Sequence, residues 1–591
     1  MRATFAGLNT MVRGIMANQL SLDTTGHNIT NAGTEGYSRQ IVNLATTYTQ
    51  ERESIHGTVR VGTGVDALSI QRARDVYADI QYRNQNPTQQ YFKAMSINYD
   101  KLETVFDDSR NLGIENALGE FYQSWVDLST SASTASVRSN VIGQGKKLSD
   151  ILQTTSAELQ EQIRSQYEDI KAEVEQVDDI LEQILKVNKQ IVTQEVTGAS
   201  ANDLRDTRDL LVDKLSNYIN ISVVEDEFGA YQVNSGGVTL INRASRTHLV
   251  MGDGVSSSVY GVDYGITDYN IKILESNMAF IPQNGTLKAH FDAIAENKAY
   301  IDKVADIANY MLTAFNEQHK QGWDMDGHSK VVDGETVPDS INFYGQDGMV
   351  YEYRYDAEFD KRYLYKYDPD ADEDPRNSNN RVGGEMLSGV RIIAELEVNT
   401  RFDENRGERY IAAATSKQYI ETSTSGGTWE DMEWNDRTGD GTNAVYLSEL
   451  FNIHFDTIIA DGKANADLLK QTCILRDLDG NPVDTNGRRI TNEDDYVNDT
   501  AISKLSINAF YEAAATTLGI NAYSVDVNYE SMEHIMVQVT NWRDSTSGVD
   551  WNEELTNMIK FQKGYSSCAR CLTAMDEMLD RLVSSTGVVG R

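Results

Sequence analysis

Residues 558–582, MIKFQKGYSSCARCLTAMDEMLDRL, place apolar side chains at alternating steps of three and four residues. The series is Met558, Phe561, Tyr565, Cys568, Leu572, Met575, Leu579 and Leu582. A helix with this spacing carries one apolar stripe along one side, which is the pattern of a coiled-coil seam. Leu555 and Ile559 widen the stripe, and residues 547–550 provide a helix start. A lone helix cannot bury such a stripe, so the sequence predicts a C-terminal helix that requires a partner.

The N-terminal end carries the same spacing. It runs through Phe5, Leu8, Val12, Ile15, Gln19, Leu22, Gly26 and Ile29. Twenty-five helical residues span about 37 Å, and neither this helix nor the C-terminal one can bury its stripe alone. We therefore expect the two ends of the chain to form paired, coiled-coil-like helices.

The middle of the chain changes from helix to strand and back. Helical patterns cover about 90–200, with one stripe from Ile163 to Ile191, and return at 285–320 and from about 443. Alternation over 219–241 indicates strands, and so do two tyrosine-rich runs, 351–355 and 363–367, joined as a hairpin. None of the six prolines lies between 88 and 281 or after 482, which permits long helices there.

This order of elements predicts a multi-domain, elongated α+β protein. Three parts are expected: a terminal helical assembly domain, a helical rod domain with a small β part, and an inserted outer β-rich domain. Their residues are 1–60 with 545–591, 61–325 with 439–544, and 326–438, respectively.

Charge and hydropathy exclude several partners. The formal net charge of −37 argues against nucleic acid, because neutralising phosphates requires an excess of Lys and Arg. It argues equally against anionic membrane surfaces. No apolar run is long enough for a membrane span. The first residues, MRATFAGLNTMV, contain no apolar core of a signal peptide, so we expect no cleaved signal peptide.

No motif indicates catalysis, a cofactor or a metal, so we expect no catalytic, cofactor-binding or metal site. The histidines show no HExxH pattern, and VGTGVDA at 61–67 lacks the third glycine of a dinucleotide loop. Cys568 and Cys571 form a CxxC inside a helical pattern, which favours packing as small apolar side chains over redox chemistry. The acidic runs at 324–328 and 368–374 lack the EF-hand ligand set and are interpreted as solvated loops.

The stretch ITNAGTEGYSRQ at 29–40 resembles a signature shared by flagellar rod, hook and hook-associated axial proteins. The residues that carry the resemblance are Asn31, Thr34, Gly36 and Tyr37, whereas Gly33 and Glu35 stand where Asn and Pro are usual. Blocks at 61–85, 118–129, 201–216, 315–327, 439–450 and 547–583 are similar to the hook-associated protein 1 branch. We interpret 30–40 as a turn in which Gly33 and Gly36 bend the backbone and the Tyr37 ring is an anchor.

The resemblance implies a structural subunit, not an enzyme, that joins the flagellar hook to the filament. Such a protein would be exported by the flagellar type III apparatus and would polymerise at the hook tip, outside the cell. Its implied partners are further copies of itself, the hook protein, the next hook-associated protein and a cytoplasmic export chaperone. The expected assembly residues are Phe5, Leu8, Val12, Ile15, Leu22, Ile29, Asn31, Gly36 and Tyr37 at the N-terminal end, and Leu555, Met558, Phe561, Tyr565, Leu572, Met575, Leu579 and Leu582 at the C-terminal end, where the chaperone would also bind.

Two other classes remain open on the sequence alone. Another axial protein, such as the hook protein or a flagellin, would share the terminal helices. A secreted carbohydrate-active protein with a helical stalk would explain the aromatic and acidic β segments.

The C-terminal stripe yields a direct test. Replacing Leu572 by Asp places a charge in the stripe, and burying that charge costs several kcal/mol. We predict that Leu572→Asp abolishes incorporation at the hook tip while the middle of the chain stays folded, as measured by immunoblotting of purified flagella and by circular dichroism. Normal assembly of this variant would show that the stripe is not a packing surface.

Overall fold

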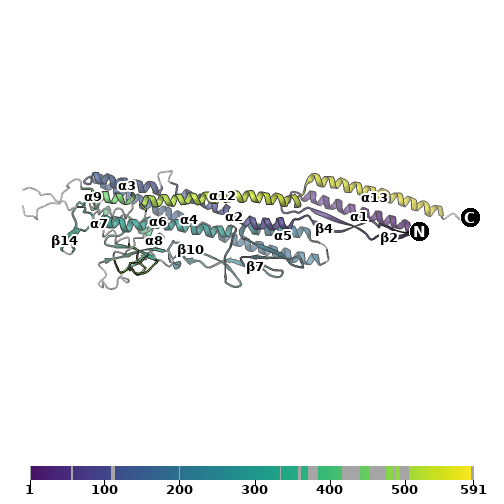
Figure 1. Ribbon diagram of the computed structural model, residues 1–591, viewed down its shortest axis with the longest axis horizontal. Helices are drawn as coiled ribbons and strands as arrows, with labels where there is room; N and C mark the ends of the chain where they lie inside the picture. The colour runs from purple at the N-terminus through teal and green to yellow at the C-terminus, as the bar shows by residue number, and fades with distance from the viewer. Residues whose placement is uncertain are drawn as a thin grey trace, which may run out of the picture.

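The computed structural model describes residues 2–54, 57–107, 113–196, 198, 200–332, 334–356, 361–369, 384–415, 440–452, 474–484, 486–492 and 505–586. The molecule is an elongated α+β protein in which the first and last helices lie side by side at one end, as Figure 1 shows. Long helices form the body, and a strand-rich insertion occupies the region after residue 325. The predicted fold class is confirmed.

Both terminal helices form as predicted. Helix α1 covers Arg2–Asn31 and α13 covers Trp551–Thr586. Between α1 and the body the chain forms strands that were not predicted from the sequence. They are β1 (Gln40–Thr46), β2 (Gln50–Ser54), β3 (Gly57–Val61) and β4 (Val65–Arg72). β1 pairs with β4 and β2 with β3, both antiparallel, so that 40–72 forms an extended β arm beside α1 (Figure 1).

The rod consists of long helices packed lengthwise. Their bounds are α2 Val76–Val105, α3 Ile114–Thr130, α4 Ala135–Glu195, α5 Asn202–Tyr218, α6 Thr286–Tyr310, α7 Asn316–Lys320, α9 Thr442–Asn452 and α12 Ile507–Ser547. The predicted stripe in 163–191 is buried along α4, whose 61 residues make it about 90 Å long. Helix α2 begins before the predicted start near 90 and contains Pro87. Proline removes one backbone donor, and packing of α2 against α5, α6 and α12 retains the helix.

The strands form small antiparallel sheets. The predicted strands near 220 are β5 (Ser222–Glu225), β6 (Tyr231–Ser235) and β7 (Val238–Ile241). Further short strands are β8 (Leu249–Met251), β9 (Val255–Ser256), β10 (Thr267–Asp268), β11 (Ile271–Ile273) and β12 (Ala279–Phe280). The insertion contains β13 (Ser329–Val332), β14 (Glu335–Pro338), β15 (Val350–Asp356), β16 (Lys361–Tyr367), β17 (Glu385–Leu387) and the short helix α8 (Val390–Glu395). β15 and β16 pair as the predicted tyrosine-rich hairpin, and 357–360 lie outside the described residues.

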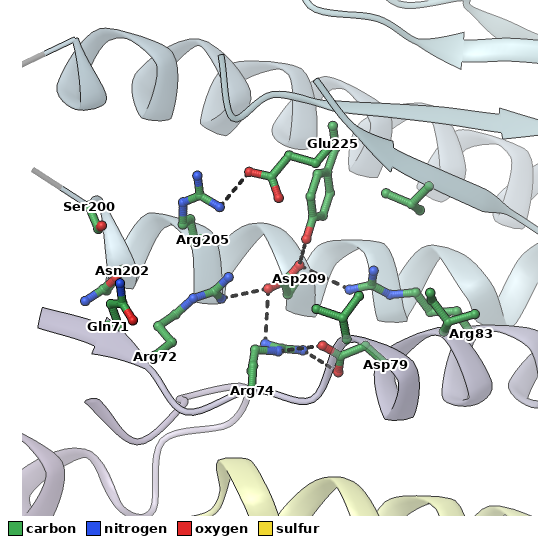
Figure 2. Close-up of a pocket in the computed structure, with 14 residues that line it drawn as sticks. Gln71, Arg72, Arg74, Asp79, Arg83, Ser200, Asn202, Arg205, Asp209 and Glu225 are labelled. Carbon is green, nitrogen blue, oxygen red and sulfur yellow. Dashed lines mark hydrogen bonds and ion pairs between the residues drawn. The ribbon is translucent and has the colours of Figure 1, made fainter. Parts of the chain in front are cut away.

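Helices α2 and α5 lie side by side at the base of the terminal helices. Figure 2 shows Asp79 and Arg83 of α2 beside Asp209 of α5, with Arg72 and Arg74 close to them. This place is therefore where the rod meets the two ends of the chain.

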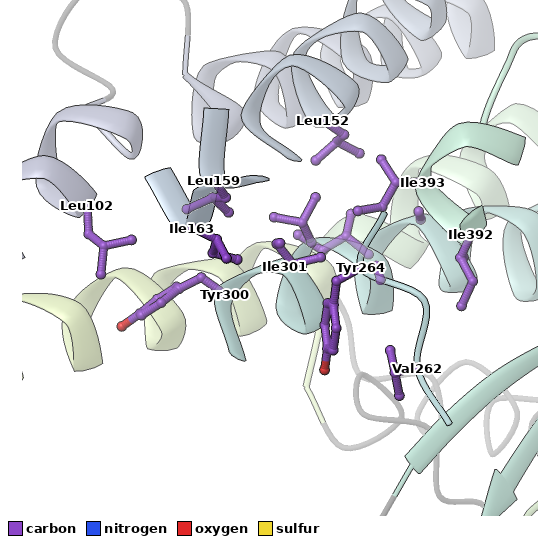
Figure 3. Packing of buried hydrophobic residues seen from close by; sticks show 14 of the residues in the cluster. Leu102, Leu152, Leu159, Ile163, Val262, Tyr264, Tyr300, Ile301, Ile392 and Ile393 are labelled. Carbon is purple, nitrogen blue, oxygen red and sulfur yellow. The ribbon is translucent and has the colours of Figure 1, made fainter. Parts of the chain in front are cut away.

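One apolar core runs through the rod and into the insertion. Figure 3 shows Leu159 and Ile163 of α4 close to Ile301 of α6 and Ile393 of α8, and all four side chains are buried. At the far end the rings of Phe121 and Phe343 lie 5.6 Å apart. Because the core crosses residue 325, the division of the chain into three domains stays a prediction.

A fully buried histidine joins three segments of this far end. The Nδ1–H of His319 donates to the Ile341 carbonyl (2.9 Å), and Nε2 accepts the Ala412 N–H (3.0 Å). Burial lowers the pKa of His319 to about 4, because a charged imidazolium would lose its hydration. The neutral ring is therefore part of the fold.

This histidine makes the fold sensitive to acid. The pKa of a histidine in an unfolded chain is near 6.5. Between about pH 6.5 and about pH 4 the unfolded chain therefore binds a proton at His319 that the folded chain does not bind, and this difference favours unfolding. We predict that His319 lowers the free energy of unfolding by about 3 kcal/mol as the pH falls through this range. Urea denaturation midpoints measured across pH test this prediction. His319→Gln should flatten that part of the pH profile, and an unchanged slope in the variant would contradict the assignment.

Candidate functional site

The two terminal helices pack antiparallel along their lengths. A methyl group added at Gly14 would lie 3.0 Å from Cys568 Sγ, and one at Gly564 would clash with Asn18 Oδ1. Nearer the chain ends, Gly7 faces Met575. The two axes therefore approach closely, because glycines occupy the contact on both helices.

We call the contact between α1 and α13 of one chain the seam. On α1, the seam is formed by small residues and not by the predicted apolar stripe. The buried side of α1 consists of Gly14, Ala17, Ser21, Thr24, Thr25 and Asn28. Leu8, Val12, Ile15, Leu22 and Ile29 are only half-buried, and Met16 is 65% exposed. The side chain of Phe5 lies outside what the structure describes. Glycine and serine allow a closer seam than leucine does, and the assembly role expected for the α1 stripe stays a prediction.

The residues of the predicted α13 stripe fall into a half-buried group and an exposed group. Met558, Phe561, Leu572, Met575 and Leu579 are half-buried. Leu555, Tyr565 and Leu582 are 44%, 41% and 51% exposed. Pairing with α1 therefore leaves a large part of the apolar surface of α13 in water.

The signature turn after α1 docks on α5. Gly36 has a φ of +78°, which favours glycine, and a methyl group there would lie 3.0 Å from Leu210 Cβ. Gly33 has neither a positive φ nor a close neighbour, so its expected role in bending the chain is not needed. Asn31 stays half-buried and accepts the Thr34 N–H at its carbonyl (2.9 Å).

Asn28 is the buried centre of this turn. Its Oδ1 accepts the Tyr37 hydroxyl (2.7 Å) and the Gln40 N–H (2.9 Å), and its Nδ2 donates to the Gln40 carbonyl (2.9 Å) and to Glu554 Oε2 (3.2 Å). The predicted anchor, Tyr37, is thus half-buried with a bonded hydroxyl. Burial, and then the nearby carboxylates of Asp203, Asp206 and Glu554, raise the pKa of Tyr37, so the hydroxyl stays a donor.

Arg39 ties the turn to the start of α13 and the end of α12. Its guanidinium binds Glu554 (2.7 Å) and Glu553, and its backbone N–H donates to the Ser547 carbonyl (2.9 Å). Glu554 is the one buried side chain on the described part of α13. These contacts therefore hold the end of α1 and the start of α13 together at the same end of the rod.

Beneath this point lies a closed ring of alternating charges. Asp209 binds Arg74 (3.1 Å) and Arg83 (3.1 Å), Arg74 binds Asp79 (2.8 Å), and Arg83 binds Asp213 (2.9 Å). Arg543 of α12 closes the ring by binding both Asp79 (2.8 Å) and Asp213. Arg72 and Asp206 extend the ring to the turn, where Asp206 accepts the Ser38 N–H (2.9 Å). Figure 2 shows the arginines converging on Asp209.

The ring is buried and internally neutral. Burial by itself would raise the pKa of Asp209, but Arg74, Arg72 and Arg83 outweigh it and hold that pKa well below its usual range. Burial by itself would lower the pKa of Arg74 and Arg83, but the carboxylates of the ring outweigh it and raise both above the ordinary value for arginine. Asp209 also accepts the Tyr231 hydroxyl (2.8 Å). Every member of the ring thus has ion-pair partners within the ring.

Sequence reasoning missed most of these polar residues. Asn28, Arg39 and Glu554 lie within or beside quoted motifs, but their burial comes from contacts far apart in the chain. The seam could have been predicted from heptad spacing, because the small or polar residues Gly7, Gly14, Ser21 and Asn28 recur every seven residues on α1.

Cysteine packing was predicted correctly for only one thiol. Cys568 is half-buried against Gly14, whereas Cys571 is exposed, so the prediction of buried packing was wrong for Cys571. Cys473 and residues 370–374 of the acidic run lie outside the described residues. In the other acidic run, Asp324 accepts the His328 N–H (3.0 Å).

Within the described residues, no three His, Cys, Asp or Glu side chains are placed to hold a metal ion together. None of the helices described here combines the length and the apolar character that crossing a membrane requires.

Two protein-family models match parts of the chain. The model described as the helical domain of flagellar hook-associated protein FlgK matches residues 99–331. The model described as the C-terminal region of flagellar basal body rod FlgEFG proteins matches residues 543–585, which include α13.

Relatives match over nearly the full length. Flagellar hook-associated protein 1 of Bacillus subtilis is 25% identical, with all of both chains covered. The protein of the same name from Escherichia coli is 22% identical over 98% of this chain and 99% of that protein. The solved structure of the flagellar hook junction protein FlgK from Burkholderia pseudomallei has the same fold. It aligns with a TM-score of 0.50 and 14% identity, covering 79% of this chain and all of that one.

The charge ring yields a stability test. Asp209→Asn removes one charge and leaves Arg72, Arg74 and Arg83 with a buried excess of positive charge. We predict a loss of about 3–5 kcal/mol in the free energy of unfolding, measured by urea denaturation. Asp203→Asn changes an exposed carboxylate on the same helix and serves as the matched control, with an unaltered midpoint. Equal midpoints for the two variants would mean that the ring does not hold α5 to its neighbours.

The matches cover the rod, α13 and the whole length of curated relatives, and the fold agrees with them. The chain is thus similar, over its whole length, to proteins named flagellar hook-associated protein 1.

Proposed function

We propose that this protein is the structural subunit that joins the flagellar hook to the filament by polymerising at the hook tip. The observation that carries the proposal is the terminal helix pair, which is held rigidly at its base and leaves apolar side chains of both helices incompletely buried. Its similarity to flagellar hook-associated protein 1 supports a structural role in the flagellum.

The terminal pair suits a repeating assembly. Apolar surface left exposed by pairing is stabilised when a neighbour covers it. Contacts repeated between different surfaces by a screw operation produce an open tube. We infer that the predicted assembly residues on α1 and α13 act in such contacts and that the division into terminal, rod and outer domains corresponds to tube wall, rod and outer surface.

The proposal includes partners and a route. The subunit contacts copies of itself, the hook protein on one side and the next hook-associated protein on the other. It is located outside the cell, after export by the flagellar type III apparatus, and a cytoplasmic chaperone holds α13 before export.

We assign no catalytic role and no cofactor. The arginines and aspartates that line the pocket at the base of the terminal helices are paired with one another. This pairing favours a structural role for the pocket over a carbohydrate-active site.

Truncation tests the proposal. Removing 549–591 deletes α13 and leaves the small-residue side of α1 uncovered. We predict that this chain, and one lacking 1–40, is absent from purified flagella, as judged by immunoblotting and electron microscopy. A chain with a short tag inserted in 368–374 is the control and should be incorporated. Normal incorporation of either truncated chain would disprove the proposed function.

A further inference from the structure

A small apolar pocket lies where three helices of the rod meet. Helix α6 forms one wall of it, and the end of α2 and the start of α12 form the others. Four of the lining side chains are aromatic, Phe106, Tyr300, Phe510 and Tyr511, and one is a lysine, Lys303. No residue of the terminal helix pair lines this pocket, so it is separate from the site described above.

The Lys303 amine occupies an unusual place for a lysine. Its Nζ lies 4.0 Å from the centre of the Tyr300 ring, and the side chain is half-buried. Among the residues that the structure describes, Glu296 is the carboxylate that acts on it, and only from a distance. Lys298, on the same helix, instead forms an ion pair with Asp268 (2.8 Å). Lys303 is therefore held by an aromatic ring and not by a counter-ion.

The surroundings of Lys303 favour its neutral form. Burial lowers the pKa of Lys303, because the charged amine loses hydration, and Glu296, two turns earlier on α6, opposes this only in part. The side chains that α2 and α12 bring to the pocket are aromatic or aliphatic. On α2, burial raises the pKa of Tyr99, a neighbour of Tyr300, to about 12, so its hydroxyl stays neutral. A lysine that gives up its proton readily in an apolar pocket is a nucleophile.

The Tyr300 hydroxyl supplies a hydrogen-bond donor in the same place. The Tyr300 side chain is 2% exposed, and within the described residues its hydroxyl has no hydrogen-bond partner. A buried hydroxyl left unpaired costs about 1–3 kcal/mol. Burial, and then the charge of Glu296, raise the pKa of Tyr300, so the group stays protonated and can donate. A carbonyl oxygen is an acceptor that would satisfy it.

The size of the pocket limits what can enter it. The space between the lining side chains is about 10 Å³, taken as the volume open to the centre of a water-sized sphere. This is room for one group of that size. A bulky compound is therefore excluded, and the aromatic walls disfavour a charged one. The amine, the hydroxyl and the small apolar space together select a small uncharged carbonyl compound.

We propose that Lys303 and the Tyr300 hydroxyl form a site for a small uncharged aldehyde, which condenses with the lysine as an imine. The neutral Nζ attacks the carbonyl carbon, and its proton passes to the carbonyl oxygen to give a carbinolamine. Loss of water then leaves a carbon–nitrogen double bond, and no electrons are gained or lost. Tyr300 donates to the oxygen during the attack. This modification site lies in the rod and does not depend on the proposed function.

The experiment measures the reactivity of single lysines in the full-length chain. The purified protein is treated near pH 7 with formaldehyde and cyanoborohydride, which reduces each imine to a methylamine, and peptides are quantified by mass spectrometry. Lys298 is the matched control, because it also lies on α6 near a tyrosine ring (5.1 Å from Tyr264) but is ion-paired. We expect methylation of Lys303 to be faster than that of Lys298 by about threefold or more. Equal rates, or faster reaction at Lys298, would overturn the assignment.

A conservative variant tests the hydroxyl. Tyr300→Phe keeps the ring and removes only the unpaired hydroxyl, so circular dichroism should show an unchanged fold. We expect methylation of Lys303 to slow by about threefold, whereas that of Lys298 stays the same. An unaltered rate at Lys303 in this variant would show that the hydroxyl takes no part in the site and would overturn the proposal.

A larger aldehyde tests the size of the site. With benzaldehyde in place of formaldehyde, we expect the preference for Lys303 over Lys298 to disappear, because the pocket has no room for the second ring. A preference that persists with benzaldehyde would contradict a site for small aldehydes.

Discussion

The closed ring of arginine and aspartate side chains at the base of the terminal helices is the interaction on which the rest of the structure depends. It connects three helices that are far apart in the sequence, since Asp79 is on α2, Asp209 on α5 and Arg543 on α12. Buried charges are costly unless every one is paired. The ring is satisfied only when all three helices are in register, so it fixes both the packing of the rod and the direction in which the chain ends leave it.

The turn at 36–40 transmits this fixed geometry to the terminal helices. Ser38 donates to Asp206, next to the ring, and Arg39 binds Glu554 on α13. Asn28 then joins α1 to the same glutamate. A short polar segment thereby links the rod, α1 and α13. Because Gly36 lies close to Leu210, position 36 has no room for a larger residue.

Much of the fold followed from periodicity, because apolar spacing directly reports the buried face of a helix or strand. The terminal helices, the α4 stripe and the tyrosine hairpin were predicted on this basis. The strands of the β arm were missed, since their side chains are largely exposed and show weak alternation. The small-residue seam of α1 was not predicted, because heptad reasoning selects large apolar residues, whereas the intrachain contact uses Gly14, Ser21 and Asn28. The charge ring has no local signature, because its members are joined only by the tertiary fold.

The small-residue seam has a mechanical consequence. Glycine and serine have no long side chains to interlock with the opposite helix, so the seam resists sliding along its axis less than a leucine zipper does. The polar contacts of Asn28 and Arg39 lock the pair at its base. We therefore expect shear applied near the chain ends to displace α1 along α13 before it distorts the rod.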